Sequence, residues 1–123
     1  MHAIEHALSV HYDITHGEGL AIVTPRWMRH IINNTTGELH DQVVERITSF
    51  GKNVFGTSTP EESIQAIHEF YESIGIPMTL REVGIDDSRI GEMARHIADN
   101  EGLDNAWVPL HEEDIAAILR DCL

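Results

Sequence analysis

The arrangement of the chain is decided by residues 2–19, which read HAIEHALSVHYDITHGEG. Residues four apart lie on one face of an α-helix, so His2 and His6 should project side by side if residues 2–11 are helical. The stretch therefore presents two imidazoles together near the start of a first helix.

A second helix should begin directly after Thr15, whose hydroxyl is a suitable N-cap for a helix running from His16 towards Asn33. His16 then lies in the first turn of this second helix and faces His2 and His6. Imidazoles that converge from two helices suit a divalent metal of borderline softness. The spacing alone also fits ordinary surface or capping histidines, since the chain has nine histidines. Gly17 and Gly19 would either let the backbone approach this site closely or only permit the turn.

The residues around the histidines are a more specific guide to function than the spacing of the histidines. Residues 2–28, HAIEHALSVHYDITHGEGLAIVTPRWM, resemble the second signature region of the iron-containing alcohol dehydrogenases, especially the butanol dehydrogenase and aldehyde reductase branch. The family pattern His-x3-His-x9-His-Gly is met by His2, His6, His16 and Gly17. Three later segments also resemble the C-terminal end of family members: 75–80, 83–85 and 113–115.

The resemblance implies a role for each histidine. In such enzymes the first and third histidines of the pattern bind the catalytic divalent metal, so His2 and His16 are the expected metal ligands. The middle histidine lies beside the metal, near the nicotinamide and the substrate, so His6 is expected to be the catalytic proton-relay group and a cofactor-binding residue. The expected cofactors are Fe²⁺, with Zn²⁺ as the second candidate, and NAD(P)H bound through another domain.

The resemblance also implies a reaction. Hydride would pass between NAD(P)H and a primary alcohol or aldehyde of the butanol type, with the metal acting as a Lewis acid on the substrate oxygen. In family members the other two ligands, from an Asp-x3-His helix, and the dinucleotide-binding domain lie upstream. Neither is found here, and the local candidates Asp13 and Asp41 have no histidine four residues later. We therefore expect the chain to be the C-terminal third of a larger enzyme and to be inactive alone.

The remainder of the chain predicts helices and no sheet. Apolar residues recur at helical spacing in four later segments, and no segment alternates with the period of two that is typical of strands. These segments are 38–51, 60–74, a stretch after the cap at 86–88, and a last helix from about His111. The sequence predicts one all-α domain over residues 1–123, a helical bundle resembling the C-terminal metal-binding domain of iron-containing alcohol dehydrogenases, which is the dehydroquinate synthase-like α domain.

The composition limits the kinds of partner that the chain can bind and the cellular compartment in which it is expected. The formal net charge is −13 and only eight residues are Lys or Arg, which argues against nucleic acid and against an anionic membrane surface. No basic region with a following apolar run marks a signal peptide, and no apolar run approaches membrane-spanning length. The single cysteine, Cys122, cannot form an internal disulfide, so a reducing cytoplasm is the expected location.

Two alternative functions remain open from the residues alone. His2, Glu5 and His6 also satisfy the His-x2-Glu-His pattern of one group of zinc peptidases, in which both histidines bind zinc and the glutamate activates water. The chain could instead be a non-catalytic helical interaction module. A surface that another domain normally covers would be exposed in this chain. We therefore expect a homo-oligomer that associates through the first two helices.

Overall fold

The computed structural model describes residues 1–123 and contains only helices and the segments that connect them. The α-helices are α1 (His2–His11), α2 (His16–Asn33), α3 (Gly37–Phe55), α4 (Pro60–Ser73), α5 (Ile90–Asn100) and α6 (Glu112–Asp121). Three short 3-10 turns lie between the later helices: η1 (Arg81–Val83), η2 (Asp87–Arg89) and η3 (Leu103–Asn105). The predicted all-α class is confirmed. None of these helices has both the length and the apolar composition needed to cross a membrane.

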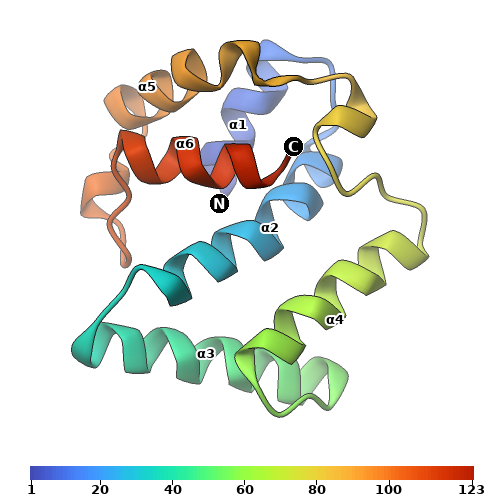
Figure 1. The fold of residues 1–123 in the computed structure, drawn as a ribbon, viewed down its shortest axis with the longest axis vertical. Helices are drawn as coiled ribbons and strands as arrows, with labels where there is room; N and C mark the ends of the chain where they lie inside the picture. Colours follow the sequence, from blue (N-terminus) through green and yellow to red (C-terminus); the bar gives the residue numbers. More distant parts are fainter.

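The central element of the fold is α2 (Figure 1). It packs against α1, α3, α4 and α6, while α5 lies against α6 and α1. Its buried residues run along most of its length, from Gly19 to Ile31. Pro25 is one of them, and the helix continues past it to Asn33. Four of the other five α-helices are therefore placed by contact with α2.

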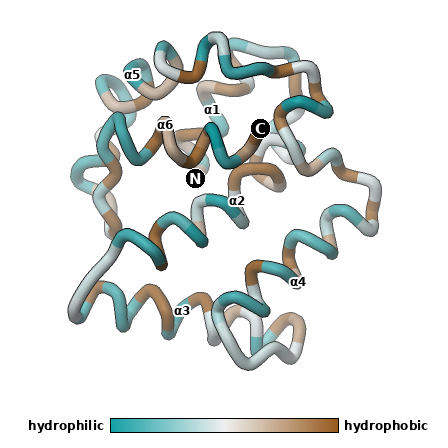
Figure 2. The backbone as a smooth tube through the Cα atoms, in the orientation of Figure 1, coloured by the Kyte–Doolittle hydropathy of each residue, from teal (hydrophilic) through white to brown (hydrophobic).

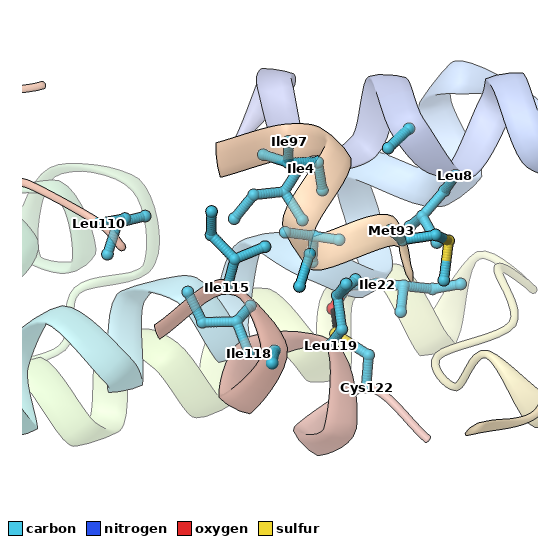
Figure 3. Packing of buried hydrophobic residues seen from close by; sticks show 14 of the residues in the cluster. Ile4, Leu8, Ile22, Met93, Ile97, Leu110, Ile115, Ile118, Leu119 and Cys122 are labelled. Carbon is cyan, nitrogen blue, oxygen red and sulfur yellow. Dashed lines mark hydrogen bonds between the residues drawn. The ribbon is translucent and has the colours of Figure 1, made fainter. Parts of the chain in front are cut away.

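Hydrophobic side chains from several helices meet in one core. The buried cluster has 22 residues, and Figure 3 shows members of it from four helices converging: Ile4 and Leu8 of α1, Ile22 of α2, Met93 of α5 and Leu119 of α6. Hydrophobic and hydrophilic residues alternate along the helices in Figure 2, as expected when one face of each helix turns inward. Each fully buried Leu or Ile contributes about 1.5–3 kcal/mol, so this cluster dominates the stability of the fold.

Side-chain caps set the starts of two helices, and the sequence predicts the first of them, at Thr15. The Thr15 hydroxyl accepts a hydrogen bond from the Glu18 N–H at 3.3 Å, and the Glu18 carboxylate accepts one from the Thr15 N–H at 3.4 Å. The Thr59 hydroxyl accepts one from the Glu62 N–H at 3.2 Å, with Pro60 as the first residue of α4. Loss of such a cap typically costs about 1 kcal/mol. The starts of α2 and α4 are therefore specified locally.

Helix α3 differs from its predicted extent, and α4 differs in how much of its apolar face is buried. α3 is longer than the expected 38–51 and continues to Phe55, where Gly56 ends it in the left-handed conformation with φ of 73°. The helical spacing of apolar residues in 60–74 continues to Phe70 and Ile74, but these side chains are 48% and 58% exposed. α4 packs against α2 and α3, and its last turn extends beyond both in Figure 1. The end of α4 therefore lies outside the core.

The contact between α3 and α4 makes Gly51 sensitive to substitution. A Cβ at Gly51 would overlap the hydroxyl oxygens of Ser63 and Thr57, which lie 3.0 Å apart in a hydrogen bond. We expect Gly51→Ala to lower the free energy of unfolding by about 1–3 kcal/mol. Gly91→Ala is the matched control, since nothing lies within 4 Å of its Cβ, and should raise it by about 0.5–1 kcal/mol. Urea unfolding followed by circular dichroism measures both, and equal effects at the two glycines would contradict this packing.

The thiol of Cys122 should be inert in the folded chain. Cys122 is fully buried beside the carbonyl oxygen of Ile22, to which its thiol donates at 3.9 Å. Burial raises the pKa of the Cys122 thiol to about 12, so almost none of it is the reactive thiolate near neutral pH. A chromogenic disulfide reagent at about pH 8 should react only after the chain is unfolded in guanidinium. Rapid reaction of the folded chain would show that this residue is accessible.

Candidate metal centre

Helices α1 and α2 bring His2 and His16 together, and each histidine is the first residue of its helix. The ten residues of α1 span about 15 Å. The four residues from Tyr12 to Thr15, extended at both ends, can run back about 13 Å along that helix. The start of α2 therefore returns to the start of α1, and the ring centroids of His2 and His16 lie 5.4 Å apart with an interplanar angle of 36°.

This separation fits two rings that share one cation. Imidazole nitrogen binds zinc at about 2.0–2.1 Å, which places the centroids of two rings on one tetrahedral ion about 5 Å apart. Neutral imidazole is also a donor that iron and zinc accept. The chain has no group of three or more His, Cys, Asp or Glu side chains that could hold a metal. His2 and His16 can therefore supply two of the four ligands that a tetrahedral ion needs.

The three histidines of the sequence pattern line one open hollow of about 380 Å³. Its lining residues are His2, Ala3, His6, His16 and Glu101. His6 comes from α1 and its Nδ1 lies 3.4 Å from Oε1 of Glu101, which directly follows α5. A larger groove of about 790 Å³ lies between α2 and α4, but it contains no histidine or cysteine and lies apart from this site. The potential metal ligands and the proposed proton-relay group thus share one surface.

A buried carboxylate supports His16 from inside the protein. Glu5 has an exposure of 0%, whereas the side chain of His16 is 56% exposed. Oε2 of Glu5 contacts Nδ1 of His16, and Oε1 accepts a hydrogen bond from the hydroxyl of Ser9. Metal-binding histidines commonly use one ring nitrogen for such a partner and the other for the metal. Nε2 of His16 is therefore the ring nitrogen left for a cation.

The two glycines after His16 differ in what they permit. A Cβ at Gly19 would lie 2.5 Å from Cγ and 2.6 Å from Oε1 of Glu5, so the backbone of α2 lies close to Glu5 at Gly19. A Cβ at Gly17 would meet nothing within 4 Å. Neither glycine has a positive φ, so neither is required by the turn. Gly19 is thus needed for the contact between α1 and α2, and Gly17 is not.

The structure argues against the zinc-peptidase alternative. That reaction needs Glu5 to activate a water molecule on a metal held by His2 and His6. The Glu5 carboxylate is instead buried, with one oxygen engaged by His16 and the other by Ser9. A carboxylate in this position cannot reach a water molecule in the hollow.

The sequence did not predict two members of the site, Glu5 and Glu101. Glu5 was interpreted only as part of the peptidase pattern. Gly19 could have indicated its role, because Gly19 follows His16 by three residues and so lies on the same face of the helix. A residue without a side chain beside a predicted ligand indicates that another helix comes close there. Glu101 gives no such signal, because it meets His6 across 95 residues of sequence.

A family model and several known proteins match this chain over nearly its whole length. The family model described as "Fe-containing alcohol dehydrogenase family, C-terminal" matches residues 1–123. NADH-dependent butanol dehydrogenase A of Clostridium acetobutylicum is 38% identical over 97% of this chain and 31% of its own length. 1,3-Propanediol dehydrogenase of Klebsiella pneumoniae is 31% identical over 98% of this chain and 31% of its own length.

A solved structure shows the same fold. The crystal structure of NADH-dependent butanol dehydrogenase A from Thermotoga maritima matches with a TM-score of 0.80 and 28% identity, covering 98% of this chain and 32% of that one. The chain spans about a third of the length of the relatives it matches. From its sequence pattern, its helical fold and these matches, the chain belongs to the Fe-containing alcohol dehydrogenase family, whose C-terminal domain it represents.

Proposed function

We propose that this chain is the metal-binding C-terminal domain of a divalent-metal-dependent, NAD(P)H-dependent dehydrogenase that interconverts primary alcohols of the butanol type and aldehydes. The observation that carries the proposal is the pair of rings of His2 and His16, 5.4 Å apart at the starts of two packed helices. Relatives that match this region are named for butanol and for 1,3-propanediol. The activity is proposed for the whole protein, because the chain spans about a third of such relatives.

His2 and His16 would hold the cation, for which Fe²⁺ is the first candidate and Zn²⁺ the second. A divalent cation bound there would supply Lewis-acid polarisation of the alcohol or aldehyde oxygen. The remaining ligands and the main NAD(P)H site would come from protein outside this chain. Residues 1–123 alone should therefore lack activity. A reducing cytoplasm remains the proposed location, consistent with the buried thiol of Cys122.

His6 would move the proton that accompanies hydride transfer. It lines the same hollow as His2 and His16, and its side chain is 66% exposed. An imidazole can both accept and donate a proton and can therefore pass one between a substrate oxygen and water. Glu101, 3.4 Å from Nδ1 of His6, would orient the ring. In the complete protein His6 would also border the nicotinamide as a cofactor-binding residue.

Metal titration of the chain tests this assignment. Anaerobic calorimetric titration with Fe²⁺, and with Zn²⁺, should show weak binding to the wild-type chain, because only two ligands are present. His2→Ala and His16→Ala should each weaken it at least about tenfold, and His6→Ala should change it little. His68→Ala on α4, far along the chain from the hollow, controls for binding to any surface histidine.

The opposite pattern would overturn the assignment. Tight one-to-one binding that requires His2 and His6 and is indifferent to His16 would return the chain to the peptidase interpretation. Equal losses for His16→Ala and His68→Ala would indicate adsorption at scattered histidines and no site.

Self-association through α1 and α2 is a second expected property of the isolated chain. α1 carries Val10, which is 64% exposed, on a helix whose partner α2 lines the open hollow. Contact of this side chain with a second copy would remove its apolar surface from water. Light scattering during gel filtration should show a concentration-dependent dimer that Val10→Glu weakens and the control Val54→Glu on α3 does not. A strict monomer at high concentration would contradict this expectation.

A further inference from the structure

We propose that Glu5 is a positioning residue for the metal centre: it holds His16 through Nδ1 and thereby keeps Nε2 as the nitrogen that binds the cation. The inference rests on the proposed function in so far as it takes His16 to be a ligand. The hold on the imidazole can be tested without any metal.

The contacts of Glu5 determine which nitrogen of His16 carries the proton. A carboxylate accepts hydrogen bonds, so the His16 nitrogen that it contacts, Nδ1, is the protonated one in the neutral ring. The lone pair of that ring is then on Nε2. The Ser9 hydroxyl donates to the other oxygen of Glu5, which leaves the carboxylate a fixed orientation. The pair of contacts thus selects one tautomer of His16.

The surroundings of Glu5 explain why it stays in this position. Its side chain is fully buried between α1 and α2, and a buried carboxylate without hydrogen-bond donors is strongly unfavourable. The space it occupies exists because residue 19 is glycine, since a Cβ there would lie 2.5 Å from Cγ of Glu5. Burial, two donors and the space at Gly19 therefore act together on one carboxylate.

The location of Glu5 suits a supporting role better than a ligand role. The cation side of His16 is the open hollow, which is lined by His2 and His6 and does not include Glu5. A partner on the far ring nitrogen orients a histidine ligand and raises its basicity, and loss of such partners typically weakens metal binding about 10–100-fold. Glu5 would therefore strengthen metal binding at His16 without touching the metal.

The first measurement is the tautomer of His16 in the metal-free chain, read from the ¹⁵N chemical shifts of its ring nitrogens well above the ordinary histidine pKa. The wild-type chain should show the Nδ1–H form. Glu5→Met fills the same volume without an acceptor and should give a mixture of the two tautomers. Glu5→Gln keeps an acceptor oxygen and should retain the Nδ1–H form.

A pair of glycine variants tests the same contact without altering Glu5. Gly19→Ala should displace the carboxylate and give the mixed tautomers of Glu5→Met. Gly17→Ala lies two residues away in the same helical turn and should keep the wild-type spectrum, because its Cβ meets nothing within 4 Å. These variants decide the question even if Glu5→Met does not fold.

The second measurement is the affinity for Co²⁺, whose visible absorption also reports its ligand geometry. Glu5→Met and Gly19→Ala should weaken Co²⁺ binding about 10–100-fold, while Glu5→Gln and Gly17→Ala should weaken it less. An Nδ1–H form that persists in Glu5→Met and Gly19→Ala would overturn the inference. Altered tautomers with unchanged Co²⁺ affinity would overturn its link to the metal. Failure of the wild-type chain to bind metal through His16 would instead count against the proposed function, and the tautomer spectra would still decide whether Glu5 holds the ring.

Discussion

The close approach of α1 to α2 at Gly19 is the constraint on which the candidate site depends. A side chain at that position would expel the Glu5 carboxylate, and without that carboxylate the first turn of α2 would lose its hold on His16. Burying a carboxylate is unfavourable by itself, and the donors from Ser9 and His16 offset that cost. The same contact therefore contributes to the fold and orients His16. Packing and the orientation of His16 are coupled at this crossing.

The position of α2 extends this coupling to the remainder of the chain. α2 packs against four other α-helices, so the direction of its first turn is fixed by contacts made along the whole helix. Its far end contacts α3 and α4, and its middle contributes Ile22 to the core formed with α1, α5 and α6. A loosened core would therefore alter the separation of His2 and His16 even though neither histidine is buried.

The sequence predicted the parts of this structure that are specified locally. The start of α2 was predicted from Thr15 as its N-cap, and the first two helices occupy the predicted ranges, because caps and helical periodicity act over a few residues. The extent of α4 was predicted to within one residue, but the spacing of Phe70 and Ile74 does not show that they are exposed, because whether a neighbouring helix reaches them depends on tertiary packing. The roles of Glu5 and Glu101 were missed because their contacts join different helices, and a histidine pattern identifies ligands without identifying what holds them.

Glu5 and His16 differ in exposure: the carboxylate of Glu5 is buried, and the imidazole of His16 is half exposed. A half-exposed imidazole at a surface hollow would normally rotate and exchange its tautomers freely, since water solvates both ring nitrogens. Here one nitrogen is engaged by a carboxylate with no exposure, and the other is left on the open side. The contacts that orient His16, from Glu5 and through it from Ser9, thus all lie within residues 1–123. A ring already held in one orientation loses less freedom when it binds, so this contact would favour the metal binding proposed for His16.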